Sequence, residues 1–439
     1  MRKLLKKLSP GQTIALGFGL MILIGSGLLM LPCSIQPGQT IHYIDALYTS
    51  TSAVCVTGLV SIDPGTAFTP LGQFFLGMLI QVGGLGVTTV GAGVILAMGK
   101  KIDLKGRNII QEAGNLGSGG GTIRFVRQVL FTTLTFELIG AALSFIVFVQ
   151  DYPPLQALGY SLFHSVAAFN NSGFDILGHS GELYANNNLF AYHDDVLLNL
   201  VTIGLIIFGG IGFLVIQEMR QHKFRWKKYS MHAKVVMTTT AALTVAGMVL
   251  IKLTQSGESW LGAFFHSVST RTAGFSTTNM GTYTDAGLLV MAVLIIIGAS
   301  PGSTGGGIKT TTFFVLLQGI LSSATNRSEK AFHFAIPGEL FRKAAVITLL
   351  ALSIVITGTF LLIVMDPQVP FIDALFEISS AFGTAGLSTG ITPGLSLGSK
   401  LLSIAIMYIG RLGPLTIATL WYFNKGERVH YPAGNIAIG

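Results

Sequence analysis

The sequence predicts an all-α membrane protein of four pseudo-symmetric repeats, each a span, a short pore helix and a second span, around one central pore. Three observations predict this class. The chain has long apolar runs, its basic and acidic segments alternate, and a short motif occurs four times at near-constant spacing.

The composition is typical of a membrane protein. Of the 439 residues 50% are hydrophobic and only 10% are charged, against about 25% charged in soluble domains. Apolar runs of about 20 residues can cross a bilayer, and the candidate runs are 13–31, 200–216, 235–251, 288–297, 345–365 and 401–423. The first run is too long for a signal-peptide core and lacks a small-residue cleavage site, so we expect a span there.

The net charge of +8 follows a membrane topology. Basic residues gather in 2–7, 100–127, 220–234, 327–343 and 425–428, and acidic segments lie between them. Lys and Arg in short loops mark the cytoplasmic side. We therefore expect a multi-pass protein with both termini in the cytoplasm, and no nucleic-acid partner.

The repeated motif places an aromatic residue ten positions before a glycine. The glycines are Gly58, Gly173, Gly274 and Gly386, which lie 115, 101 and 112 residues apart by subtraction of their positions. Thr, Ser or Ala precedes each glycine, and Leu or Phe follows it. Self-similarity at a fixed period indicates repeated structural units.

The motif divides the chain into segments. We expect repeat 1 over 1–99, a cytoplasmic linker over 100–125, repeat 2 over 126–220, repeat 3 over 221–322, repeat 4 over 323–423 and a C-terminal tail over 424–439. The linker includes a glycine-rich stretch, 117–122, without the G-K-[ST] ending of a phosphate-binding loop. We interpret it as a connector.

An apolar helix of about ten residues precedes each motif glycine and is too short to cross a hydrocarbon core of about 30 Å. We expect these helices to be re-entrant, with Asp45 and Asp373 as N-caps of two of them. Irregular backbone at membrane depth is stable only when it is buried in protein or lines a water-filled cavity. Four equivalent turns around one axis meet that requirement.

These turns, the four filter loops, are predicted to bind a cation through backbone oxygens. Glycine reaches φ > 0 at little cost, carbonyl rings can replace the water shell of a cation, and helix C-termini carry partial negative charge. The loops contain no carboxylate, so we expect a monovalent ion. Glycines that merely allow close helix packing are the alternative, which four copies at one spacing disfavour. The assigned residues are Val56, Thr57, Gly58, Asn171, Ser172, Gly173, Thr272, Ala273, Gly274, Thr384, Ala385 and Gly386.

Each second span also carries a glycine cluster, at 83–86, 209–212, 298–301 and 410–413. For the first two clusters we favour close helix packing. The third belongs to an intramembrane loop, 298–308, in which Pro301 and five glycines should break the helix. We expect this loop below the filter loops, where it obstructs the cavity until it moves. Ile308 spoils its likeness to a phosphate-binding loop. The assigned gate residues are Gly298, Ser300, Pro301, Gly302, Ser303, Thr304, Gly305, Gly306, Gly307 and Arg411.

Residues 54–59 (VCVTGL) and 270–275 (TRTAGF) resemble the selectivity-filter loops of the Trk/Ktr/HKT superfamily of potassium transporters. The similarity covers nearly the whole chain and is strongest to membrane subunits of bacterial Ktr systems. It implies potassium uptake across a bacterial cytoplasmic membrane and a gating role for the intramembrane loop. Sodium-favouring members commonly carry serine at the first filter glycine, where this chain has Gly58.

The resemblance also implies partners and ions. K⁺ would be the transported ion and Na⁺ a possible activator. The chain would form a homodimer in the lipid bilayer, with one pore per chain. A cytoplasmic ring of RCK-type subunits, resembling the regulatory subunit of Ktr systems, would bind the nucleotide.

Lone charged residues need partners inside the membrane, where an arginine costs about 2.5–3.5 kcal/mol on insertion scales. Arg411 could latch the intramembrane loop through its carbonyls, and a structural pair with Glu137 is the alternative. Arg271 is expected behind the filter loops, with Glu377 as a candidate partner. His164 and His266 are interpreted as packing or hydrogen-bonding residues.

Other function classes are weaker. A secondary cation symporter coupled to sodium is the alternative function. Transporters with inverted repeats place broken helices at midplane, whereas these units repeat in parallel. An intramembrane enzyme would need a catalytic pair on facing spans, and the sequence shows none.

Overall fold

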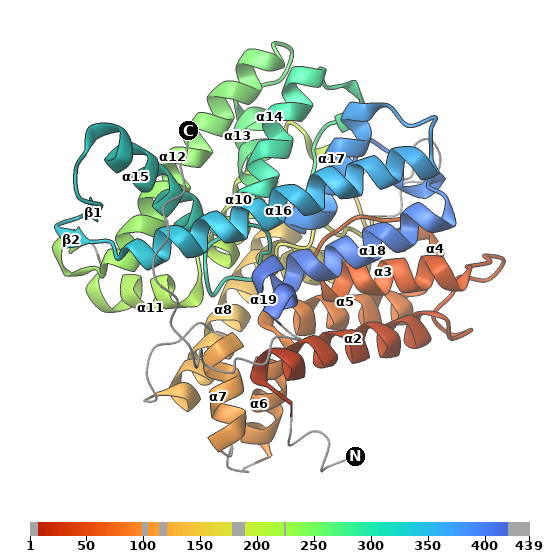
Figure 1. The fold of residues 1–439 in the computed structure, drawn as a ribbon. Helices are drawn as coiled ribbons and strands as arrows, with labels where there is room; N and C mark the ends of the chain where they lie inside the picture. Colours follow the sequence, from red (N-terminus) through yellow and green to blue (C-terminus); the bar gives the residue numbers. More distant parts are fainter. Residues whose placement is uncertain (1–7, 99–103, 114–120, 178–188, 224, 420–439) are drawn as a thin grey trace.

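The computed structural model describes residues 8–98, 104–113, 121–177, 189–223 and 225–419. Within those ranges the chain is helical apart from loops and one hairpin, β1 (Lys330–Ala331) with β2 (Phe334–Ala335) (Figure 1). The predicted tail and most of the glycine-rich linker stretch lie outside the described residues.

Each repeat consists of a long helix, a short pore helix and a broken second span. Repeat 1 has α2 (Pro10–Leu29), α3 (Tyr43–Val54), α5 (Pro70–Leu85) and α6 (Val87–Ala97). Repeat 2 has α8 (Thr122–Phe148), α9 (Pro154–Phe169), α10 (Val196–Gly210) and α11 (Phe213–His222). Repeat 3 has α12 (Met231–Thr254), α13 (Trp260–Ser269), α14 (Asp285–Ile296) and α15 (Thr310–Thr325). Repeat 4 has α16 (Gly338–Met365), α17 (Phe371–Gly383), α18 (Leu397–Leu412) and α19 (Pro414–Thr419).

Short elements connect these helices. They are α4 (Pro64–Ala67), α7 (Leu104–Ala113), η1 (Phe190–Tyr192), η2 (Trp226–Lys228), η3 (Met280–Thr282) and η4 (Thr392–Gly394).

The first helix of each repeat, α2, α8, α12 and α16, is long and apolar enough to cross a membrane. The pairs α5–α6 and α10–α11 pass the same test together, although each is bent by 101°. The run predicted at 200–216 is therefore two helices that meet at Gly212. Its φ of +97° lies in the region that glycine tolerates best.

The predicted caps of two pore helices are wrong. His42 and Pro370 occupy the N-cap positions of α3 and α17. Asp45 and Asp373 lie within the first turns instead, where a carboxylate still complements the positive end of the helix dipole. Asp45 also pairs with Lys400 of repeat 4 at 2.8 Å.

The repeats close into a ring because each second span contacts the pore helix of the next repeat. The contacts run from α5 to α9, from α10 to α13, from α14 to α17 and from α18 back to α3. One hydrophobic core cluster includes residues of all four repeats. The structure thus has the predicted all-α architecture around one axis.

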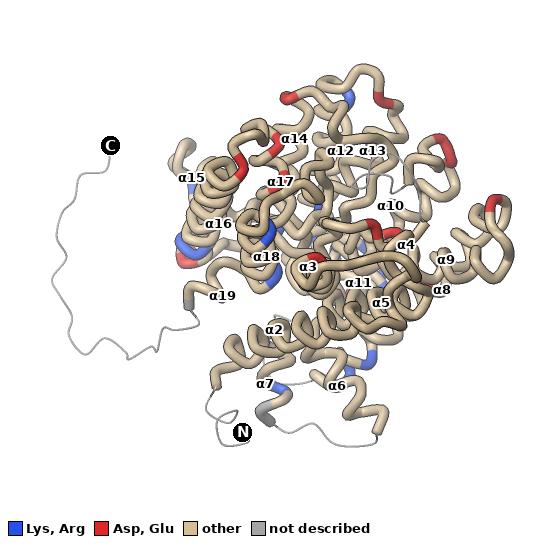
Figure 2. The backbone as a smooth tube through the Cα atoms, turned by 90° about the vertical axis from the view of Figure 1, so that its right-hand side faces the viewer, with Lys and Arg blue, Asp and Glu red and all other residues tan. Residues whose placement is uncertain are grey.

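Charges are distributed unevenly over this ring. In Figure 2, most Asp and Glu mark loops near α4, α9 and α14, with one Lys or Arg segment among them at the top, whereas Lys and Arg occur beside α7 and near α15 and α16, where an Asp or Glu segment adjoins them. This uneven distribution is what the sequence predicts for an acidic outer side and a basic inner side. The orientation of the chain in the membrane stays a prediction.

Candidate ion pathway

Each pore helix ends in a loop with an unusual backbone conformation. The residue two positions before the motif glycine has a positive φ: +56° at Val56, +57° at Asn171, +72° at Thr272 and +49° at Thr384. The glycines follow with φ of +92° at Gly58, +67° at Gly173, +79° at Gly274 and +90° at Gly386. Left-handed conformations of non-glycine residues cost about 1–3 kcal/mol and cluster at functional sites.

Backbone N–H groups of these loops bond back to their own pore helices. The amide of Gly58 donates to Ser52 Oγ and that of Gly386 to Ser380 Oγ, each at 3.0 Å. The amides of Thr57, Ser172, Ala273 and Ala385 donate to pore-helix carbonyls at 2.7–2.9 Å. The donors are thereby satisfied within each repeat.

The four filter loops meet one another in cyclic order. A Cβ added to each motif glycine would overlap the carbonyl oxygen that precedes the glycine of the next repeat. The pairs are Gly58 with Ser172, Gly173 with Ala273, Gly274 with Ala385 and Gly386 with Thr57. Four carbonyl groups therefore lie within one closed ring, and only glycine leaves room for this approach.

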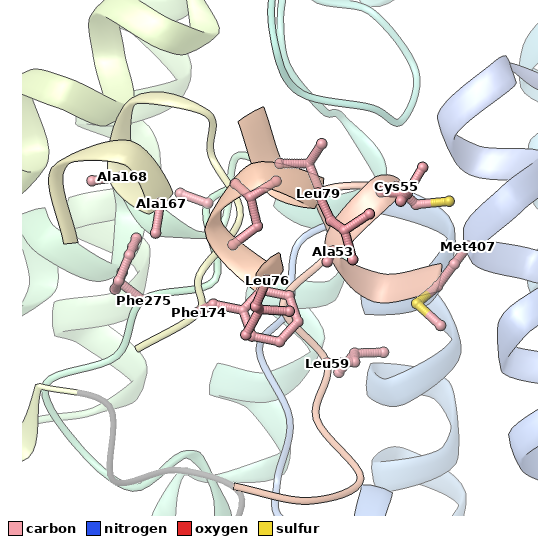
Figure 3. Close-up of a cluster of buried hydrophobic side chains, with 14 of the residues drawn as sticks. Ala53, Cys55, Leu59, Leu76, Leu79, Ala167, Ala168, Phe174, Phe275 and Met407 are labelled. Atoms are coloured by element: carbon pink, nitrogen blue, oxygen red, sulfur yellow. The ribbon is translucent and has the colours of Figure 1, made fainter. Parts of the chain in front are cut away.

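The residues that follow the motif glycines anchor the loops in the core. Leu59, Phe174, Phe275 and Leu387 are all buried. Figure 3 shows Leu59, Phe174 and Phe275 in one apolar cluster with Leu76 of α5. The ring of His164 packs edge-on against Phe275, with centroids 5.2 Å apart, and His164 Nε2 lies 2.9 Å from Thr202 Oγ1.

The intramembrane loop lies directly against the filter loops. A Cβ on Gly305 would overlap the Thr272 hydroxyl, and a Cβ on Gly306 would overlap that of Thr384. Both hydroxyls are buried and have no hydrogen-bond partner within the described residues. The loop thus fills the space beside repeats 3 and 4 where these polar atoms point.

Repeat 2 holds the other side of the loop. The amides of Ser300 and Thr304 donate to the carbonyls of Gly210 and Gly209, at 3.0 and 3.2 Å. The amide of Phe213 donates to Gly302 at 3.0 Å.

The loop also bonds to itself. Ile297 and Ile308 form a parallel bridge, the Ala299 amide donates to Gly306, and the Ser303 hydroxyl donates to the Ser300 carbonyl. Gly302 and Gly307 both have a φ of +68°, and a Cβ on Gly298 would overlap the Gly306 carbonyl. A Cβ on Gly212 would lie 2.6 Å from the Pro301 carbonyl oxygen.

Arg411 connects the loop to repeat 1. Its guanidinium donates to the carbonyl of Thr304 and to those of Gly83 and Gly84 at 2.5 and 3.1 Å. The alternative pairing with Glu137 is wrong. Glu137 instead accepts from Gln81 Nε2 at 3.3 Å and Asn170 Nδ2 at 3.1 Å.

Lys309 is a loop contact that the sequence analysis missed. Its ammonium donates to the carbonyls of Gly305 and Gly306, at 2.7 and 3.3 Å. Its position just after the glycine run, in an otherwise apolar stretch, was the available signal.

The candidate pairing of Arg271 with Glu377 is also wrong. Arg271 donates to the Thr240 carbonyl at 3.1 Å and approaches the hydroxyls of Thr240 and Thr244. Glu377 accepts from Ser388 and Thr392 at 2.7 and 2.6 Å. Both side chains therefore form their hydrogen bonds within their own repeats, although Arg271 Nε has no partner among the described residues.

Comparisons with known proteins agree with this architecture. A family model described as "TrkH: Cation transport protein" matches residues 12–234 and 229–427. The solved structure of the potassium transporter TrkH from Vibrio parahaemolyticus has a TM-score of 0.72 and 18% identity. The match covers 95% of this chain and 87% of that one. At that identity the likeness concerns the fold.

Curated relatives match over nearly their full length. Ktr system potassium uptake protein B from Bacillus subtilis is 37% identical, over 99% of this chain and 97% of that protein. Potassium/sodium uptake protein NtpJ from Enterococcus hirae is 36% identical, over 100% and 99%. Ktr system potassium uptake protein B from Vibrio alginolyticus is 33% identical, over 98% and 94%. This chain therefore belongs to the TrkH family of cation transport proteins, within the Trk/Ktr/HKT group.

Proposed function

We propose that this protein takes up K⁺ through the four filter loops. The closed ring of carbonyl groups beside Gly58, Gly173, Gly274 and Gly386 carries this proposal. Two of the relatives are named as potassium uptake proteins and a third as a potassium/sodium uptake protein. The ion passes down the membrane potential, worth about 2.3 kcal/mol per charge per 100 mV.

Backbone oxygens suit a weakly hydrated monovalent cation. The pore helices α3, α9, α13 and α17 end at the ring, and each contributes the partial negative charge of its C-terminus. The twelve filter residues include no Asp or Glu. The ring attracts a cation without the formal charge that would favour a divalent ion.

The intramembrane loop acts as the gate. Its glycines abut the Thr272 and Thr384 hydroxyls, and the cations of Arg411 and Lys309 hold its carbonyls. Opening the path requires these contacts to break. In this proposal Na⁺ is an activator of the pore, and sodium-coupled transport is the alternative.

A cytoplasmic partner controls the gate. The name "Ktr system" of two relatives refers to a system of which the named protein is one component. We propose a homodimer in a bacterial cytoplasmic membrane, with a ring of RCK-type subunits that bind the regulatory nucleotide on the inner side.

The test is ⁸⁶Rb⁺ uptake by potassium-uptake-deficient cells that express Gly274→Ser. A side chain at Gly274 meets both a positive φ and the Ala385 carbonyl. We expect Rb⁺ uptake to become sensitive to Na⁺ competition. Gly257→Ser is the matched control, because no atom lies within 4 Å of a Cβ there. Equal discrimination by Gly274→Ser and wild type, at equal expression, would contradict the proposal.

The sodium-coupled alternative is separated by removing Na⁺. Uptake through a pore continues in sodium-free medium, at a reduced rate if Na⁺ is an activator. A symporter would take up no Rb⁺ in sodium-free medium. In medium that contains Na⁺, it would carry Na⁺ and Rb⁺ at a fixed ratio.

A further inference from the structure

A buried polar network lies behind the loop segment that follows Gly274 in the third filter loop. The hydroxyl of Tyr283 donates to Glu258 Oε2 at 2.7 Å and lies 3.0 Å from His266 Nδ1. The amide of Thr277 donates to His266 Nε2 at 3.3 Å. Thr277 is the third residue after Gly274, so the network reaches the backbone that leaves the ion path.

Hydrogen-bond accounting fixes the protons of this network. A phenol has one hydrogen, which Tyr283 gives to the Glu258 carboxylate, so His266 must donate from Nδ1 to the Tyr283 oxygen. The neutral ring then accepts from the Thr277 amide at Nε2. Loss of the Glu258 charge would weaken the acceptor that orders the chain, because hydrogen bonds to an ionised oxygen are stronger than those to a neutral one. The Thr278 hydroxyl also donates to Glu258 Oε2, at 3.3 Å.

The outer end of the network reaches solvent through His193. Its Nε2 lies 4.0 Å from Glu258 Oε1, a buried oxygen with no hydrogen-bond partner within the described residues. The His193 side chain is 28% exposed, whereas that of Glu258 is 3% exposed. Histidine is the side chain that ordinarily changes charge between about pH 5 and 8.

The other ionisable groups around this pair are few. Asp194 Oδ1 lies 3.7 Å from the same His193 nitrogen, but its side chain is 96% exposed. Lys252 Nζ donates to the backbone carbonyls of Glu258 and Ser256 at 2.5 and 3.0 Å. Tyr283 and His266 complete the set. Among the described residues, His193 is thus the solvent-exposed imidazole facing the Glu258 carboxylate.

We propose that Glu258, acting through Tyr283 and His266, positions the outer part of the third filter loop, and that protonation of His193 strengthens this support. The inference rests on the proposed potassium function of the filter loops. Protonated His193 supplies the charge partner that Glu258 Oε1 lacks, and neutral His193 does not. Preference for K⁺ over Na⁺ should therefore be higher at acidic outside pH.

The fourth repeat provides an internal reference. Glu377 bonds directly to Ser388 and Thr392, and Ser388 is the second residue after Gly386. That carboxylate needs no relay, and both its oxygens have hydroxyl donors. Repeat 3 uses a longer chain of hydrogen bonds, through His266 and Tyr283 to Glu258, and this chain ends beside His193.

The test measures how strongly Na⁺ competes with ⁸⁶Rb⁺ uptake in potassium-uptake-deficient cells at outside pH 5.5 and 8.5. At each pH, the ratio of Rb⁺ uptake with Na⁺ to Rb⁺ uptake without Na⁺ cancels the driving force that both measurements share. We expect wild type to discriminate about threefold better at pH 5.5, the scale of a partly exposed charge pair. His193→Gln should behave at both pH values like wild type at pH 8.5, and His193→Arg like wild type at pH 5.5.

Two further variants separate the network from general charge effects. Asp194→Asn should keep the wild-type pH dependence, whereas Glu258→Gln should lose it. If the glutamine and arginine variants of His193 both retain the wild-type pH dependence, the inference is wrong. If wild type shows no preference for Rb⁺ at any pH, the proposed function itself fails, which is a different result.

Discussion

The second span of repeat 3 differs from those of the other three repeats at the same glycine-marked place. In repeats 1, 2 and 4 the break is confined to a residue or two, at Gly86, Ile211–Gly212 and Gly413, and a new helix starts at once. In repeat 3, α14 ends at Ile296 and α15 starts at Thr310, and the loop between them turns back on itself.

The shared glycines explain how the second spans of repeats 1, 2 and 4 pack closely against their pore helices. A Cβ on Gly83, Gly209 or Gly410 would overlap the carbonyl of Val54, Phe169 or Phe382, the residue four positions before the motif glycine. These glycines let each second span seat the end of its own pore helix. Close packing is therefore common to these repeats, and the long loop is an addition in one of them.

The largest effect is expected when a glycine that packs against a pore helix is replaced by alanine. Gly209→Ala should strongly reduce the yield of correctly folded protein, because its Cβ would overlap the Phe169 backbone, and overpacking of a core costs about 1–3 kcal/mol, a large share of a protein's stability. Gly204→Ala, in the same helix with open space around its Cβ, should be neutral. Fluorescence-detected size-exclusion chromatography of both variants checks this. Equal peaks would show that α10 does not need the close contact.

Shortening the loop should make repeat 3 resemble the others. Deletion of 302–306 removes the glycines that abut Thr272 and Thr384, so we expect a large rise in basal ⁸⁶Rb⁺ uptake without the cytoplasmic partner. Unchanged or lower uptake at normal expression would count against a gate.

Loosening the loop should have a smaller effect. Arg411→Ala removes charged donors to the Thr304 and Gly84 carbonyls, and even one such bond is worth about 1.5–3 kcal/mol, so basal uptake should rise at least about tenfold. Lys309→Met should give a rise in the same direction, and Arg411→Lys should restore part of the closure. A drop in uptake with intact folding would argue against the latch.

The loop segments that follow the motif glycines provide the smallest predicted effect. Asp175 in repeat 2 occupies the place of Ser276 in repeat 3, outside the spanning helices. Burial and the nearby charge of Asp63 raise the pKa of Asp175 to about 7. Its carboxylate is therefore ionised above that pH and neutral below it, so cation uptake should rise about twofold between outside pH 6 and 8 at low salt. Asp175→Asn should remove this rise for Rb⁺ and Na⁺ alike. If the rise in uptake with pH persists in Asp175→Asn, another group causes it.

The sequence was sufficient to predict the repeats and their turns because both depend on local properties. A ten-residue apolar helix before glycine cannot span a bilayer, and a glycine in the left-handed region needs no distant partner to be recognised. The residues predicted for the filter loops do lie together in a ring, although their ion-binding role stays a prediction. The same reasoning did not anticipate the extra cation of Lys309 on the loop.

Partners of charged side chains were beyond the sequence. Arg411 was predicted to donate to carbonyls of the intramembrane loop, and it does bond to that of Thr304. Its bonds to the carbonyls of Gly83 and Gly84 in repeat 1 were not predicted. The suggested acids for Arg271 and Arg411 were wrong because a guanidinium inside the protein is satisfied as well by carbonyl and hydroxyl oxygens as by a carboxylate. Such acceptors are present on every helix, and no spacing in the sequence selects among them.

By itself the sequence determined that four units repeat in parallel, and it predicted that each turns back within the membrane, because about ten apolar residues are too few to cross a bilayer. Only the tertiary structure decided which atoms face each other: that Gly305 meets Thr272, and that Glu258 reaches the third loop through Tyr283. These contacts join segments far apart in the chain, so they depend on how the four units close around their axis.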